Sequence, residues 1–109
     1  MSETPKDWSI RVDHMISACE EIQAYTKGLT AENFLKDLKT VRSVERCFTI
    51  IGELPTESRD IQQQHPSIEW SDIIGMRHVI THDYDRTRDM IIWSTFQNKL
   101  PDFRDSLKI

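Results

Sequence analysis

The residues best suited to chemistry lie together in one segment, from Arg77 to Tyr84. This segment contains the guanidinium of Arg77, the imidazoles of His78 and His82, and the phenol of Tyr84. A guanidinium stays charged and suits a phosphate, and an imidazole can exchange protons near neutral pH. A phenol can donate or accept a hydrogen bond, or be covalently modified. No other segment of the chain combines so many reactive groups.

These groups match the needs of RNA cleavage by the RNA's own 2′-hydroxyl. That reaction requires a base, an acid for the leaving oxygen and a cation for the charge on phosphorus; His82 suits the first two tasks and Arg77 the third. Positions five apart on a regular helix point about 140° away from each other. We therefore expect the helix to end near His82, or a twofold dimer to bring two copies of Arg77 and His82 around one cleft.

Simpler interpretations of the same residues remain open. Arg77 at a helix surface would ordinarily be solvated, and His82 at a helix end would ordinarily act as a cap or a dipole partner. His78, His82 and Asp85 have a spacing that could hold a metal ion, but the acid of an HExxH motif is missing because Val79 follows His78. We expect no metal and no cofactor.

Composition limits the classes of function. The 109 residues suit one domain, 1–109, and a net charge of −4 argues against a protein that coats nucleic acid. A nuclease with a local cationic cleft stays possible if arginines gather on one face, with Arg77 joined by Arg42, Arg46, Arg86 and Arg88. The two cysteines, Cys19 and Cys47, are too few for a disulfide framework, and we expect free buried thiols in a reducing cytosol.

Targeting and membrane signals are weak. No apolar run approaches the roughly 20 residues that span a bilayer, and residues 1–6 lack an apolar segment. These features predict a soluble cytoplasmic protein.

Apolar residues recur every three or four positions, which predicts an all-α, up-and-down bundle of about five helices. Helices are expected over 7–27, with Gly28 as a C-cap, in a short segment after Thr30, and over 40–54, where Pro55 ends the helix or begins another turn. The segment 56–69 reads as a short helix or a loop. Further helices should follow Ser71, as an N-cap, and Asp85, as another cap, and a last turn should open at Pro101.

Details of these helices carry further expectations. Gly75 lies inside a helix, where it costs about 1 kcal/mol relative to Ala, and close approach of a neighbouring helix would compensate. The helix after Asp85 should bury a stripe of Met90, Trp93, Phe96 and Leu100. Arg46 and Glu53 share one helix edge two turns apart, where they would line the cleft or form an ordinary surface pair.

Three blocks of sequence resemble the HepT-like members of the HEPN superfamily, and the resemblance runs from about residue 8 to residue 107. The first is Arg77-x4-His82-x-Tyr84, which resembles the motif of that family. The other two are Ile50-Ile51-Gly52-Glu53, and Trp70-Ser71-Asp72-Ile73-Ile74-Gly75-Met76-Arg77, and the spacing of Leu100-Pro101 after Trp93 is similar as well.

This resemblance implies a HEPN-like helical bundle that forms a homodimer with the motif at or near the twofold interface. It implies a metal-independent ribonuclease that serves as a toxin, with Arg77 and His82 as the catalytic pair. A minimal nucleotidyltransferase antitoxin would be the partner, in a larger complex if more copies join, and would silence the toxin by transferring AMP to Tyr84. The family often has Asn after the motif arginine, so His78 is a departure that leaves open whether this residue assists catalysis.

Two other functions compete with the ribonuclease. The chain would serve as a non-catalytic nucleotide- or partner-binding subunit of the nucleotidyltransferase if its Arg77 cleft holds nucleotide without cutting RNA. It would be a helical adaptor if the motif has lost its function.

Overall fold

The computed structural model describes the backbone of residues 7–82 and 86–108, and the side chains of residues 8–80 and 87–108. These ranges contain helices and no strand, which confirms the all-α prediction. The helices are α1 (Asp7–Thr26), α2 (Ala31–Lys36), α3 (Leu38–Glu57), α4 (Arg59–Gln64), α5 (Trp70–His82), α6 (Arg86–Asn98) and α7 (Leu100–Leu107).

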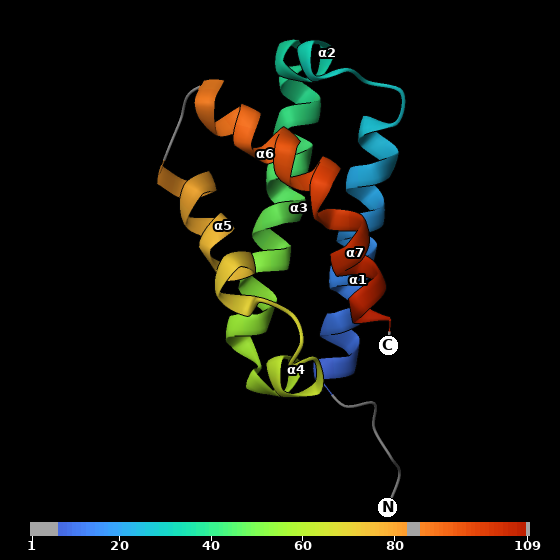
Figure 1. The fold of residues 1–109 in the computed structure, drawn as a ribbon, viewed down its shortest axis with the longest axis vertical. Coiled ribbons are helices and arrows are strands. Elements are labelled where there is room, and N and C mark those ends of the chain that lie inside the picture. Colours follow the sequence, from blue (N-terminus) through green and yellow to red (C-terminus); the bar gives the residue numbers. More distant parts are fainter. Residues whose placement is uncertain (1–6, 83–85, 109) are drawn as a thin grey trace, which may run out of the picture.

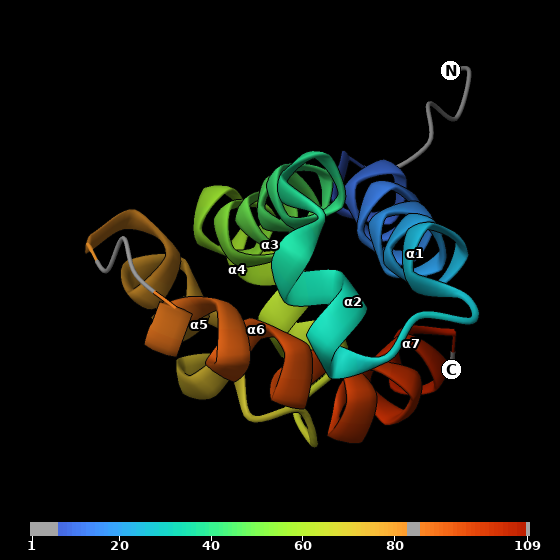
Figure 2. The same ribbon diagram turned by 90° about the horizontal axis from the view of Figure 1, so that it is seen from above.

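Helix α3 is the centre of the bundle. Helix α1 runs antiparallel to it on one side and α5 runs antiparallel to it on the other, as Figure 1 shows. Helices α6 and α7 cross one face of this layer, α2 lies across one end, and α4 lies at the other (Figures 1 and 2). The described residues form seven helices where about five were expected, because the segment 56–69, read as a short helix or a loop, contains α4, and the last turn expected at Pro101 is the helix α7.

Several helix ends follow local sequence signals. Gly28 adopts a φ of 80° after α1, which confirms it as the residue that stops that helix. Thr30 caps α2, because its side chain accepts a hydrogen bond from the Asn33 backbone N–H at 3.1 Å. Asp37 caps α3 in the same way, and hydrogen bonds from the side chain and backbone of Thr40 lower the pKa of its carboxyl.

Helix α3 begins at Leu38, slightly earlier than expected, and continues through Pro55 to Glu57, which confirms the alternative in which Pro55 begins another turn. A side chain from outside the helix satisfies a carbonyl group of this last turn. The Gln62 amide donates to the Pro55 carbonyl at 3.0 Å. Helix α5 begins at Trp70, so Ser71 lies in its first turn and is not its N-cap.

The buried face of α6 also differs from the expected stripe. Met90 is 45% exposed, whereas Ile92, Phe96 and Leu100 are buried. Arg88, one turn before Ile92, is buried as well. The expected place of Arg88 on an exposed cationic face was therefore wrong.

Both cysteines are free and buried, as expected. Burial raises the pKa of the Cys19 thiol and of the Cys47 thiol to about 12. The two groups stay protonated near neutral pH, so neither is suited to act as a nucleophile. Within the part of the chain that the structure describes, no helix has the length and apolarity needed to cross a membrane.

The glycines of α3 and α5 have opposite surroundings. A Cβ added at Gly52 would lie 3.0 Å from the Arg77 Cβ and 3.5 Å from the Ile73 carbonyl oxygen. A Cβ added at Gly75 would meet nothing within 4 Å, so the predicted close approach of a helix at Gly75 was wrong. The close contact occurs at Gly52 instead, where α5 packs directly on α3.

This contrast predicts opposite effects of the same substitution at the two glycines. Gly75→Ala gains helix propensity without a clash and should raise Tm by about 4–8 °C, from a stabilisation of about 1 kcal/mol. Gly52→Ala should lower Tm, because the new methyl group pushes α5 away from α3. Thermal unfolding followed by circular dichroism measures both, and a rise in Tm for Gly52→Ala would contradict the packing.

Candidate functional site

Helix α5 carries Arg77, and three contacts along its length hold it in place. At its first turn the Trp70 indole N–H donates to the His65 carbonyl at 2.9 Å, and the ring packs edge-on against Phe103. In its middle, the backbone at Arg77 lies against Gly52. In its last turn, Arg88 donates to the Ile80 carbonyl at 3.3 Å. The guanidinium of Arg77 therefore projects from a helix that is fixed at both ends.

Arg77 and Glu53 come together on one side of α5. The Arg77 Nε lies 4.0 Å from a Glu53 carboxylate oxygen, and both side chains are a little under half exposed. An ion pair of this length in contact with water stabilises the fold by little. Its effect is to bias where the guanidinium points while leaving it accessible to a ligand. Glu53 therefore belongs to the candidate site, as the sequence suggested.

Arg46 has a different place. It is exposed on α3, two turns or about 10 Å before Glu53 along the helix axis. Among the described residues, the ion-pair partner of Glu53 is Arg77 and not Arg46. The interpretation of Arg46 and Glu53 as an ordinary surface pair was therefore wrong. Arg46 remains on the same edge of α3, without a contact that joins it to Arg77.

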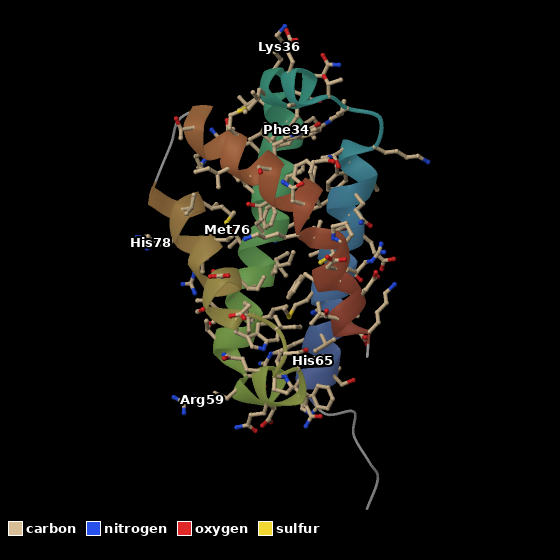
Figure 3. The ribbon with its side chains drawn as sticks, in the orientation of Figure 1. Phe34, Lys36, Arg59, His65, Met76 and His78 are labelled. Carbon is tan, nitrogen blue, oxygen red and sulfur yellow. The ribbon has the colours of Figure 1, made fainter. Side chains whose placement is uncertain are left out.

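The two histidines of the motif belong to α5. The helix is described as far as His82, so the expected helix end near His82 stays a prediction. His78 is exposed at the outer edge of α5 (Figure 3). The side chain of His82 and the whole of residues 83–85, including the predicted AMP acceptor Tyr84, lie outside the described residues.

Metal ligands do not gather in the part of the chain that is described. Residues 8–80 and 87–108 contain no cluster of three His, Cys, Asp or Glu side chains that could hold an ion. The combination of His78 with His82 and Asp85 involves side chains outside these ranges.

The expected gathering of arginines on one exposed face is wrong for Arg88, which is buried in an ion pair with Glu45. Arg42 pairs with the same carboxylate at 3.2 Å but stays exposed, as do Arg46 and Arg77. The side chain of Arg86 lies outside the described residues.

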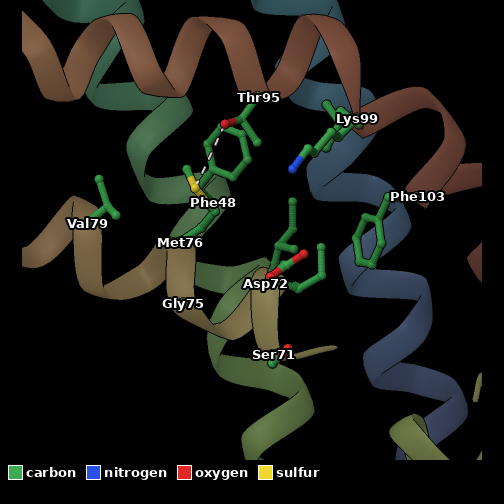
Figure 4. A pocket seen from close by; sticks show the side chains of 12 residues that line it. Phe48, Ser71, Asp72, Gly75, Met76, Val79, Thr95, Lys99 and Phe103 are labelled. Atoms are coloured by element: carbon green, nitrogen blue, oxygen red, sulfur yellow. Dashed lines mark hydrogen bonds between the residues drawn. The ribbon is translucent and has the colours of Figure 1, made fainter. Parts of the chain in front are cut away.

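A pocket of about 350 Å³ opens on the other side of α5, between α5 and the α6–α7 pair (Figure 4). Apolar side chains form most of its wall, among them Phe48, Met76 and Phe103, and Lys99 and Asp72 are its charged residues. Its apolar wall does not suit an RNA backbone, whose charges require cations. No pattern in the sequence indicated this pocket, because its lining comes from three separate segments.

Comparison with known proteins identifies the family. The sequence model described as "Ribonuclease HepT-like" matches residues 15–109. No solved structure matches the chain significantly.

The names of similar proteins agree with this family. A candidate RNase from Caldanaerobacter subterraneus subsp. tengcongensis is 32% identical, with 97% of this chain and 93% of the relative covered. A protein from Thermococcus cleftensis named probable ribonuclease HepT is 30% identical, with coverage of 95% and 93%. A candidate RNase from Methanocaldococcus jannaschii is 26% identical, with coverage of 83% and 78%. With the helical bundle and the matched family model, these similarities show that the chain belongs to the ribonuclease HepT-like family.

Proposed function

We propose that this protein is a metal-independent endoribonuclease whose catalytic pair is Arg77 and His82. The observation that carries the proposal is the placement of Arg77, which is accessible, has its Nε 4.0 Å from a Glu53 carboxylate oxygen, and lies on the same helix as His82. The names of the relatives support the same substrate class.

The reaction needs no group beyond these side chains. One His82 removes the proton from the 2′-hydroxyl, whose oxygen attacks the adjacent phosphorus. Arg77 stabilises the additional negative charge on the phosphoryl oxygens. The bond from phosphorus to the 5′-oxygen breaks, and a second imidazole donates a proton to that oxygen. The products are a 2′,3′-cyclic phosphate and a 5′-hydroxyl.

A homodimer supplies the second imidazole. Because positions five apart on a regular helix point about 140° away from each other, we expect Arg77 and His82 of one chain to converge poorly on one phosphate. In a dimer with twofold symmetry, His82 of each chain lies beside Arg77 of the other chain. The proposed site therefore belongs to two protomers, and His78, exposed on the same helix, is a candidate for assisting proton transfer.

The proposed biological role is that of a toxin in a toxin–antitoxin pair. A minimal nucleotidyltransferase transfers AMP from ATP to the Tyr84 hydroxyl, which forms a phosphodiester and releases pyrophosphate. The added negative charge, two residues from His82, repels the RNA phosphate, and the adenosine fills the cleft.

One observation favours the competing function of a non-catalytic nucleotide- or partner-binding subunit. The chain is acidic overall, and Arg88 is buried in an ion pair with Glu45, so that arginine cannot meet an RNA. A single nucleotide or an acidic partner needs fewer cations than a polynucleotide. RNA cleavage by the isolated protein separates the two functions.

The first prediction concerns cleavage without metal. Purified protein with unmodified Tyr84 should cut single-stranded RNA in EDTA, and His82→Ala or Arg77→Ala should lower the rate by at least about 10²-fold. His14→Ala, which changes an exposed histidine on α1, should cleave like the unmodified sequence. Equal cleavage by His82→Ala would exclude this mechanism, and no cleavage by the unmodified sequence would leave the binding function.

The second prediction tests whether the site is shared by two chains. Because one cleft needs the His82 imidazoles of both chains, a dimer with a single intact His82 should be inactive. Chains of the unmodified sequence and of His82→Ala, mixed in equal amounts, unfolded and refolded, should therefore retain about a quarter of full activity, which is the share of random dimers with two intact chains. Retention of about half of full activity, with mixed dimers present by native mass spectrometry, would contradict a site shared in this way.

The third prediction concerns Tyr84. Incubation with the cognate minimal nucleotidyltransferase and ATP should add the mass of adenylyl groups and abolish cleavage. The chain contains two tyrosines, so Tyr25→Phe is a matched control that should still gain this mass, whereas Tyr84→Phe should not. Modification that persists in Tyr84→Phe would move the acceptor elsewhere.

A further inference from the structure

We infer that Arg88 is a positioning residue for the proposed catalytic site, a role that rests on the proposed ribonuclease function. Its side chain is 4% exposed and reaches three helices at once. It starts on α6, donates to the Ile80 carbonyl of α5, and forms an ion pair with Glu45 of α3. No other arginine among the described residues is buried.

The contact with Ile80 holds the end of the helix that carries the catalytic pair. Ile80 lies two residues before His82, in the last described turn of α5. The Arg88 Nη1 donates to this carbonyl at 3.3 Å. His82 follows two residues later, so a shift of this turn moves the base relative to Arg77.

The remaining donors of Arg88 fix the guanidinium itself. Its Nη2 donates to Glu45, and its Nε and Nη2 donate to Asp89 at 3.2 and 3.0 Å. The side chains of Glu45 and Asp89 are 13% and 20% exposed, so these charges attract each other with little screening by solvent. The two carboxylates therefore hold the Arg88 guanidinium in the orientation in which it donates to the Ile80 carbonyl.

The geometry of the bundle explains why this link matters. Helix α5 packs most closely against α3, and a pocket of about 350 Å³ separates part of α5 from α6 and α7. Arg88 connects the end of α5 to α6 beside this pocket, where apolar packing is incomplete. Without it, the last turn of α5 keeps its contacts with α3 but loses the charged link to α6.

Arg104 provides a matched control. It also links two helices, because its Nη1 on α7 donates to Gln23 of α1 at 2.6 Å, but it has no contact with α5. Arg88→Met should lower kcat for RNA cleavage about 10- to 100-fold with little change in KM, since a displaced catalytic group slows chemistry more than binding. Arg104→Met should leave kcat unchanged, and Arg88→Lys should recover part of it.

Amide hydrogen exchange supplies a readout that does not depend on catalysis. Exchange of the segment 77–82 should accelerate in Arg88→Met and not in Arg104→Met. Unchanged exchange in that segment would overturn the inference, as would unchanged kcat in an active protein. If the unmodified sequence does not cleave RNA, the ribonuclease proposal fails. The exchange measurement still tests whether Arg88 holds the end of α5.

If Arg88→Met does not fold, a double variant tests the inference instead. Glu45→Met with Arg88→Met removes both buried charges together, which proteins tolerate far better than removal of one. This variant should fold and show the same fast exchange of residues 77–82 and the same loss of kcat. A folded paired variant with native exchange and native kcat would show that Arg88 has no positioning role.

Discussion

The direct packing of α5 on α3 is the constraint on which the candidate site depends. Gly52 presents no side chain to α5, so the backbone at Arg77 lies against α3 and Glu53 lies within reach of the guanidinium. The glycine and the acid are adjacent in the sequence, and one sets the distance between the helices while the other biases the arginine. A side chain at position 52 would change both at once.

The ends of α5 are held by polar contacts and not by apolar packing alone. Trp70 donates to the His65 carbonyl at the first turn, and Arg88 donates to the Ile80 carbonyl at the last. Such bonds fix direction as well as distance, since a donor must point at its acceptor. Such contacts stabilise a helix beside a pocket, because fewer side chains surround it there.

The charges of this protein are divided between two tasks. Arg88 is buried in its ion pair with Glu45, whereas Arg42, Arg46 and Arg77 are exposed. Only the exposed arginines can meet a ligand, so counting arginines overstates the cationic surface.

Much of this protein was predictable from its sequence, because the signals involved are local. Apolar periodicity predicted the all-α class, the caps at Thr30 and Gly28 follow from side-chain and backbone preferences, and the blocks around Gly52 and Arg77 indicated the family that the comparisons then identified. Tertiary structure alone decided which glycine meets a neighbouring helix, because Gly52 and Gly75 look alike in sequence and differ only in what lies opposite. It also decided that Arg88 is buried and that Glu53 pairs with Arg77 and not with Arg46. The charge pattern of one helix indicates which of its residues share a face. The residues that this face contacts are distant in the chain, so the pattern does not identify them.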